Sequence, residues 1–289
     1  MRYYAPTTTA EAIAALAAEP GTARVLVGGT DLLVAVRHRR LEPALLVDIK
    51  RVRDLAPPVT VDADGITFGP TATMSDVATH PDVERWFPSL AEAAMTVGSV
   101  AIRNRASLIA NCANGSPAAD TAPPLVALGA SVIITSAAGE RSAQLRHFFL
   151  GSRRTLCAPG EIVTALRVPR PGPGSSSSFL RMTRRRGVDL ATVSVAAVVE
   201  RDGRTTVGLG AVGPVTLLGG PTGPVDHGSE AEIDAAITEL LTSATPIGDV
   251  RAGLAYRTAM LRVLTRRAVL RATERRVAST PTELSGRQG

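Results

Sequence analysis

The chain has 289 residues, of which 45% are hydrophobic, so it can bury a sizeable core, and its length allows more than one domain. Its formal net charge is +6, but aromatic residues make up only 3% and no stripe of interleaved basic and aromatic residues occurs, which argues against a nucleic-acid partner. Lysine and arginine total 32, and Lys50 is the only lysine, a bias more typical of a GC-rich genome than of a function.

Cysteine usage and hydropathy exclude several further classes. Cys112 and Cys157 are too few and too far apart for a disulfide framework, a zinc site or an iron-sulfur cluster. No histidine is close to Cys112 in the sequence, so a small buried thiol is favoured over a nucleophile. The N-terminus continues into an alanine-rich helix rather than a signal peptide, and no apolar run reaches membrane length. We therefore expect a cytoplasmic protein with no membrane span and no metal site.

The first part of the chain alternates helical and extended patterns. The spacing predicts a capped amphipathic helix, a strand, a helical turn and a second strand, at residues 8–17, 24–27, from 31 onward and 44–49. Pro20-Gly21 ends the first helix, and Pro57-Pro58 ends the segment as a whole. This order of elements makes a small β-α-β unit, so we expect residues 1–57 to form one subdomain.

Residues 58–172 continue the alternation and are expected to form a second subdomain. Strands are predicted at residues 66–68, 131–135 and 161–168, and helices at residues 75–79 and 81–95. Thr73 is placed to cap the first of these helices. A polar stretch, AIRNRASLIANCANGSPAAD, occupies residues 101–120 before the apolar run at 124–128.

A stretch dense in proline, glycine and serine, PRPGPGSSSS at residues 169–178, is predicted to be a linker because this composition cannot build a core. Residues 190–199 and 205–212 then have the pattern of two strands of a meander, joined by the turn at Asp202-Gly203. We expect residues 178–277 to form a C-terminal α+β domain, an antiparallel meander plus helices.

Helical patterns complete this domain at residues 230–241 and 250–276. The arginines of the last helix are most simply its solvated face, although they could also dock a partner. They are Arg251, Arg257, Arg262, Arg266, Arg267 and Arg271. The tail at residues 278–289 is expected to be disordered.

Two loops have the residues of a ligand cradle. Gly28-Gly29-Thr30-Asp31 follows the predicted strand at 24–27, and such glycines let a backbone approach a pyrophosphate while helix-start amides favour an anion. Strand-to-helix turns without ligands often carry the same residues, so this loop alone does not identify a site. The polar stretch at 101–120 adds short side chains that bond nearby backbone and ligand oxygens, as a phosphate or sugar site requires.

The two loops together resemble the signature of the flavin-binding subunit of molybdenum hydroxylases, the xanthine dehydrogenase and aerobic carbon monoxide dehydrogenase group. The resemblance rests on Val27 to Asp31, Ile102 to Arg105 and Asn111 to Asp120, and it continues in the family's order over nearly the whole chain. It implies an α+β fold: a two-subdomain FAD-binding fold of the PCMH type, followed by the C-terminal α+β domain. It also implies that the two loops enclose the FAD pyrophosphate.

The resemblance assigns FAD-binding residues to both loops and implies no catalytic side chain. Val27, Gly28, Gly29, Thr30 and Asp31 would hold the phosphates from one side. Ser107, Asn111, Ser116 and Asp120 would serve the other side and the ribose, with Ile109 and Ala110 in the same loop.

The second loop departs from the family at Ile109-Ala110, where the family usually has two glycines in the run Thr-Ile-Gly-Gly-Asn. If the loop keeps the family's backbone path with a positive φ, Ile109 is strained by about 1 to 3 kcal/mol and fills space that the diphosphate would use. Restored glycines would then tighten FAD binding. If the loop is rebuilt, restored glycines gain nothing.

The run Arg184-Arg185-Arg186 precedes Asp189-Leu190-Ala191 and could seat a nucleotide or a partner's carboxylates. In the family this region approaches the flavin, so a cofactor-side role stands beside the simpler interpretation of a surface strand start. No paired-carboxylate, zinc-protease, nucleophile-elbow or Walker motif occurs elsewhere in the chain.

The resemblance implies an oxidoreductase, the FAD-binding electron-transfer subunit of a molybdopterin dehydrogenase complex. FAD would receive electrons from iron-sulfur clusters on a small partner subunit, which takes them from a large molybdopterin-binding subunit, and would pass them to a small-molecule electron acceptor. The alternative is a relative that has left such a complex, a stand-alone enzyme or scaffold whose cleft binds another ligand after the loss of the two glycines.

Overall fold

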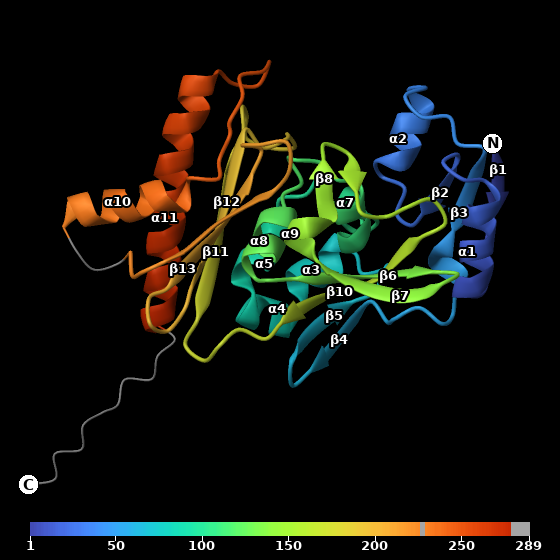
Figure 1. The fold of residues 1–289 in the computed structure, drawn as a ribbon, viewed down its shortest axis with the longest axis horizontal. Coiled ribbons are helices and arrows are strands. Elements are labelled where there is room, and N and C mark those ends of the chain that lie inside the picture. Colours follow the sequence, from blue (N-terminus) through green and yellow to red (C-terminus); the bar gives the residue numbers. More distant parts are fainter. Residues whose placement is uncertain (226–228, 279–289) are drawn as a thin grey trace, which may run out of the picture.

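The computed structural model describes residues 1–225 and 229–278, which form three units in a row (Figure 1). An N-terminal unit lies at one end, a mixed unit lies in the middle, and a sheet with helices α10 (Glu230–Leu240) and α11 (Leu254–Ala278) lies at the other end. In the described part of the chain, no helix combines the length and hydropathy that a membrane crossing requires. Of the tail expected to be disordered, 278–289, Ala278 is the last residue of α11, and residues 279–289 lie outside the described residues.

The N-terminal unit is a parallel sheet of three strands in the order β1-β3-β2. Its elements are β1 (Arg2–Tyr4), α1 (Thr9–Ala18), β2 (Ala23–Leu26), α2 (Leu32–Arg37) and β3 (Leu45–Asp48). Ile13 and Leu16 of α1 pack with Val47 to form its core. Leu26 pairs with Asp48, so β2 and β3 end together and the segments that follow them share one edge of the sheet. Ligands of parallel sheets bind at this carboxyl edge.

The middle unit is built on an antiparallel sheet in the order β4-β5-β10-β6-β7. Its strands are β4 (Val59–Asp62), β5 (Gly65–Phe68), β6 (Ser131–Ser136), β7 (Gly139–Gln144) and β10 (Ile162–Pro169). The last of these strands in the sequence, β10, is the central one and pairs with β5 on one side and β6 on the other. Phe68, Leu90 and Leu166 belong to the apolar core that this sheet shares with its helices.

Short helices and one small hairpin complete the middle unit. They are α3 (Met74–Thr79), α4 (Pro81–Trp86), α5 (Pro88–Met95), α6 (Val100–Arg103), α7 (Leu108–Ala113), α8 (Ala122–Ala127), α9 (Leu145–Phe148), β8 (Phe149–Gly151) and β9 (Arg154–Thr155). The short helix η1 (Ile49–Arg51) follows β3 and belongs to the N-terminal unit, where Ile49 is part of the core. Thr73 caps α3 as expected, in a capping box with Asp76.

The single helix expected at residues 81–95 is wrong, because the segment forms two helices separated at Phe87. Pro88 has no amide hydrogen to donate and disfavours helical geometry at the residue before it. At the start of α5 the same proline is tolerated, since the first turn of a helix needs no intrahelical donor.

The C-terminal unit is an antiparallel sheet whose strands lie in sequence order: β11 (Ser176–Met182), β12 (Val193–Val199), β13 (Thr205–Gly210) and β14 (Leu217–Thr222). Helix α11 packs on β11 and β12, while α5 and α8 of the middle unit pack on the same sheet from the other side (Figure 1). Nearly every residue of β12 is therefore buried, as in sheets with both faces covered.

The linker expected at residues 169–178 is too long, because its last three serines belong to β11. The Ser177 hydroxyl accepts a hydrogen bond from the Ser89 amide at 3.1 Å, and Ser178 donates one to the Ala268 carbonyl at 2.7 Å. Small hydroxyl side chains fit at this strand because helices of two units cover both faces of the sheet. Composition alone does not reveal such packing.

The solvated face expected for the arginines of the last helix is wrong for Arg257, which is 1% exposed. Its guanidinium group donates to the carbonyl oxygens of Thr192 at 2.9 Å and Ala211 at 2.7 Å, and to the Asp249 carboxylate at 2.5 Å. A guanidinium group carries five donors in a rigid fork, so one buried arginine can satisfy several acceptors.

Candidate functional site

Two loops that are far apart in the sequence touch each other at two points. A Cβ atom built on Gly28 would overlap the carbonyl oxygen of Arg105, so the two backbones pass with no room for a side chain. Further along, the Asn114 side-chain amide donates to the Asp31 carboxylate at 3.1 Å. The first loop, Gly28–Asp31, and the second loop, residues 105–121, therefore lie side by side.

The first loop presents its backbone. Gly29 has a φ of +73°, a left-handed conformation that glycine adopts without strain. Within residues 1–225 and 229–278, the amides of Gly28, Gly29, Thr30 and Asp31 have no hydrogen-bond acceptor. Four consecutive free donors directly before α2 suit an oxyanion such as a diphosphate.

Lys50 follows β3 at the same edge of the sheet and bonds the residue before the first loop. Its ammonium group donates to the Val27 carbonyl at 3.0 Å and to the Asp48 carboxylate at 2.6 Å. The other Asp48 oxygen accepts from the Tyr3 hydroxyl at 2.7 Å. Burial acts to raise the pKa of Asp48, but the hydrogen bonds from Lys50 and Tyr3 outweigh it and the pKa lies below its ordinary value.

The second loop is built around helix α7 rather than around glycine turns. Ser107 caps this helix, and its hydroxyl accepts from the Ala110 amide at 3.4 Å. Ile109 is helical and buried in the core of the middle unit, and neither Ile109 nor Ala110 has a positive φ. The strain considered for Ile109 is therefore absent. Cys112 is buried in the same helix, as expected, and burial raises the pKa of its thiol to about 12.

Asn111 and Ser116 are partly bonded within the second loop. The Asn111 side-chain oxygen accepts from the Thr121 hydroxyl at 2.8 Å, and the Ser116 hydroxyl accepts from the Ala118 amide at 3.3 Å. The side-chain amide of Asn111 and the hydroxyl hydrogen of Ser116 have no acceptor among the described residues. Both donors are available to a ligand oxygen.

Asp120 is nearly buried and connects the second loop to the C-terminal sheet. One carboxylate oxygen accepts from Arg181 of β11 at 2.6 Å, and the other is buried without a hydrogen-bond partner in the described chain. The nearby Thr96 hydroxyl donates to the Ala93 carbonyl instead. Burial raises the pKa of Asp120 to about 6, although Arg181 acts in the opposite direction. An unpartnered buried oxygen is costly, so a ligand hydroxyl would stabilise it.

The second loop is tied to the C-terminal sheet a second time, through Ala211. This residue has a φ of +61°, its amide donates to the Pro117 carbonyl at 2.8 Å, and its carbonyl accepts from Arg257. A left-handed alanine costs about 1 kcal/mol or more, so these bonds on both sides hold it in place. Arg181 and Arg257 thus position the second loop from the C-terminal domain.

Sequence reasoning misses the contacts of Lys50, Arg181 and Arg257. Only Lys50 carries a signal, since it is the one lysine among 32 basic residues. The two arginines bond residues more than 40 positions away, and no local pattern indicates such partners.

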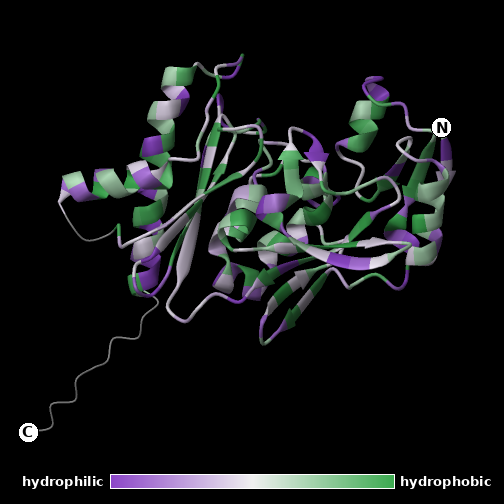
Figure 2. Cartoon of the chain, in the orientation of Figure 1, coloured by the Kyte–Doolittle hydropathy of each residue, from purple (hydrophilic) through white to green (hydrophobic). Residues whose placement is uncertain are grey.

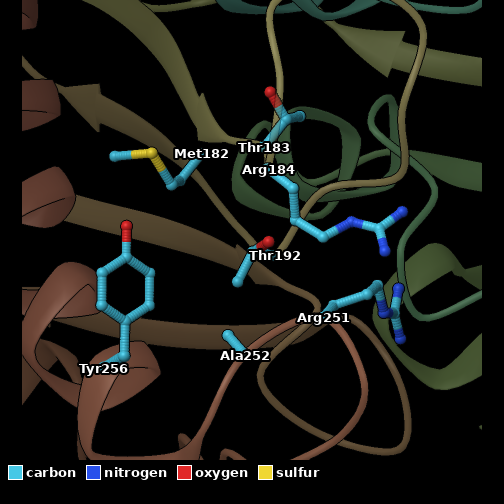
Figure 3. A pocket seen from close by; sticks show the side chains of 7 residues that line it. All are labelled: Met182, Thr183, Arg184, Thr192, Arg251, Ala252 and Tyr256. Atoms are coloured by element: carbon cyan, nitrogen blue, oxygen red, sulfur yellow. The ribbon is translucent and has the colours of Figure 1, made fainter.

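A separate open hollow of about 370 Å³ lies in the C-terminal domain, where Figure 3 shows Arg184 and Arg251 extending to the same side. Arg184 pairs with Asp189 at 2.8 Å, and Arg251 pairs with Asp249 at 2.8 Å. The hydrogen bond from Arg184 lowers the pKa of Asp189 to about 2. Because Arg184 and Arg251 each already have a carboxylate, this arrangement favours a local structural role for Arg184. The hollow is lined by Met182, Thr183, Arg184, Thr192, Arg251, Ala252 and Tyr256.

Two family models match the chain. Residues 1–171 match the FAD binding domain in molybdopterin dehydrogenase, and residues 178–272 match the CO dehydrogenase flavoprotein C-terminal domain. Fold and site therefore define a two-domain flavin-binding protein.

Known relatives and solved structures agree over nearly the full length. The carbon monoxide dehydrogenase medium chains of Hydrogenophaga pseudoflava and Afipia carboxidovorans are each 29% identical to this chain, over 92% and 94% of it and 95% and 96% of their own lengths. The solved carbon monoxide dehydrogenase from Hydrogenophaga pseudoflava matches with a TM-score of 0.88 and 28% identity, over 96% of this chain and 98% of that one. Quinoline 2-oxidoreductase from Pseudomonas putida 86 matches with a TM-score of 0.86 and 28% identity, over the same shares.

The chain belongs to the family of FAD-binding subunits of molybdenum hydroxylases, as the resemblance in the two loops implies. Its cofactor is FAD, and it belongs among the oxidoreductases. The expected α+β fold, with an FAD-binding part followed by a C-terminal domain, is confirmed.

Proposed function

We propose that this chain is the electron-transfer subunit of a molybdenum-containing hydroxylase or dehydrogenase. A large molybdopterin-binding subunit oxidises the substrate, and a small iron-sulfur subunit carries the electrons to this chain. FAD, when bound here, supplies the redox chemistry that passes them to a small-molecule acceptor. The observation that carries the proposal is the row of four free amides in the first loop, beside the polar second loop.

The residues present fit FAD. The amides of Gly28 through Asp31 would bind the diphosphate, with Val27 fixed behind them. On the other side, the free donors of Asn111 and Ser116 would bind phosphate oxygens, and the unpartnered oxygen of Asp120 would accept a ribose hydroxyl. Ser107, Ile109 and Ala110 would contribute the helix cap and backbone, not apolar side chains. The chain positions the cofactor and needs no acid or base of its own.

The helix beside the first loop supports a role within a complex. Helix α2 begins directly after Asp31 and has no buried residue, and Leu33 and Val34 are 44% and 50% exposed. Figure 2 shows this helix as largely hydrophobic with a hydrophilic end, where the exposed turn at residues 37–40 lies. An uncovered apolar surface next to a cofactor loop is typical of a protein contact.

The alternative of a stand-alone relative drew its support from the two lost glycines. Ile109 is a helical core residue, so its side chain takes no space beside the first loop's amides. That reason for preferring the alternative is removed.

The test begins with the chain purified alone and, separately, co-expressed with candidate large and small subunits of this family from the same genome. We expect a yellow protein that releases FAD on denaturation, and substrate should bleach the flavin absorbance only when the small subunit is present. A preparation that stays colourless after incubation with excess FAD contradicts the proposal. Bleaching without the small subunit contradicts the electron route but not the cofactor.

A further inference from the structure

Lys50 is unusual in this chain by its type and by its place. Every other position that carries a permanently basic side chain is an arginine. Lys50 follows β3 at the carboxyl edge of the parallel sheet, where Leu26 and Asp48 end their strands in register. Lysine differs from arginine because its ammonium group is compact and carries three donors that diverge from one atom.

Two of these three donors are bonded within the protein, to Val27 and to Asp48. The third has no acceptor among the described residues, and the side chain is 40% exposed. Because Val27 is the residue before Gly28, the bond to its carbonyl holds the Lys50 ammonium group within one peptide unit of the row of unbonded amides in the first loop. A cation is thus held beside neutral donors that suit an oxyanion.

We propose that Lys50 is a further ligand of the FAD diphosphate, held against the first loop by Asp48 and Val27. This inference rests on the proposed FAD site. A charge-assisted hydrogen bond is shorter and stronger than one from a neutral amide, so the ammonium group adds affinity that the amides alone lack. An arginine carries its donors on a planar guanidinium group, so it does not reproduce three bonds that diverge from one atom.

Amine acylation tests the proposal on the unaltered protein. Lys50 is the one ε-amino group, and peptide mapping by mass spectrometry separates it from the N-terminal amine. We expect brief treatment with acetic anhydride to acetylate Lys50 in the apo-chain and to leave it unmodified when FAD is bound. The variant Arg204→Lys supplies an internal reference. Residue 204 is exposed and lies directly before β13, at the end of this strand that is farther from Ala211 and the second loop. Its acetylation should be the same with and without FAD.

Variants then measure the contribution of the ammonium group. Lys50→Met should weaken FAD binding about ten-fold or more, with a smaller effect at high salt, and Lys50→Arg should restore part of the loss. Tyr3→Phe is the matched control, since it removes a bond to Asp48 without changing any donor of Lys50. Its affinity for FAD should equal that of the wild type.

The outcomes separate this inference from the function on which it rests. Equal acetylation of Lys50 with and without FAD, while absorbance shows the flavin bound, overturns the role of Lys50 and leaves the FAD site standing. A chain that shows no flavin absorbance at any FAD concentration overturns both.

Discussion

The two loops that meet at the candidate site are built in opposite ways. The first loop offers four amides that no side chain occupies, and Gly28 passes too close to Arg105 to carry a Cβ atom. The second loop uses its polar groups on itself and on the C-terminal domain, as the pairs Ser107 with Ala110 and Asp120 with Arg181 show. Asn111 and Ser116 of the second loop nevertheless keep one free donor each, so polar composition alone does not separate the binding groups of a loop from its positioning groups; the free donors do.

The largest effect should follow from replacing Ile109 and Ala110 by glycine. If the second loop is a helix with a core side chain, the double variant Ile109→Gly with Ala110→Gly loses about 4 to 6 kcal/mol of unfolding free energy, from the cavity and two helical glycines. Urea denaturation measures this loss, with Ile109→Val as a control that costs about 1 kcal/mol. Tighter FAD binding with unchanged stability would show that the loop is not helical when the cofactor is bound.

A substitution in the first loop should lower the affinity for FAD rather than the free energy of unfolding. In Gly28→Ala the added methyl overlaps the Arg105 carbonyl, so the two backbones must separate. We expect FAD binding to weaken by about 2 to 3 kcal/mol, roughly 30- to 140-fold, with the circular dichroism spectrum retained. Gly21→Ala is the control: Gly21 has a φ of +77° and open space around it, so this variant is strained without touching the loops. Equal effects of the two variants on FAD affinity would remove the special role of Gly28.

The link between the second loop and the C-terminal sheet should depend on pH through Asp120. Its pKa is raised from 3.8 to about 6 in the folded protein. As pH rises, Asp120 therefore loses its proton at a lower pH in the unfolded chain than in the folded protein. The unfolding free energy of the wild type, relative to Asp120→Asn, should therefore be highest below pH of about 4 and fall through pH of about 6, by on the order of 2 kcal/mol. Urea melts of both proteins across this range measure it. A constant difference contradicts the burial of an ionisable Asp120.

The smallest effect should come from the contact between the loops at Asn114. Asn114→Ala removes the hydrogen bonds to Asp31 and from Arg153, which lies across the second loop. Two exposed hydrogen bonds contribute about 1 kcal/mol together, so FAD affinity should fall only a few-fold. Asn104→Ala, which loses a bond to Ser75 outside the contact, should leave FAD affinity unchanged in the same fluorescence titration.

The sequence predicts the features that local patterns encode. Strand, turn and helix signals place Gly28–Asp31 correctly between β2 and α2, because glycine geometry acts between near neighbours. The polar stretch at 101–120 is expected to be a loop, but it contains α7 and most of α6. Pro88 also carried enough information to predict the break between α4 and α5, since its effect is local.

Other features depend on partners that the sequence does not bring together. The composition around Ser177 predicts a linker, whereas the structure shows a strand covered by helices on both faces. The pattern around Arg257 predicts a solvated side chain, whereas its carbonyl acceptors lie just before β12 and just after β13. The departure at Ile109 misleads for the same reason: whether an isoleucine blocks a ligand or fills a core depends on which way the surrounding chain turns.

The place of β10 has a consequence for synthesis on the ribosome. This strand is central in its sheet, yet it is translated after both of its neighbours. The chain adds about 100 residues between the end of β5 and the end of β10, which takes roughly 5 to 20 s at ordinary elongation rates. Until β10 is made, the edge of β5 that carries Ile66 and Phe68 has no partner strand. The edge of β6 that carries Ile134 likewise has none. Unpaired edges of this kind attract other chains, so the nascent protein is open to such pairing until its middle strand emerges.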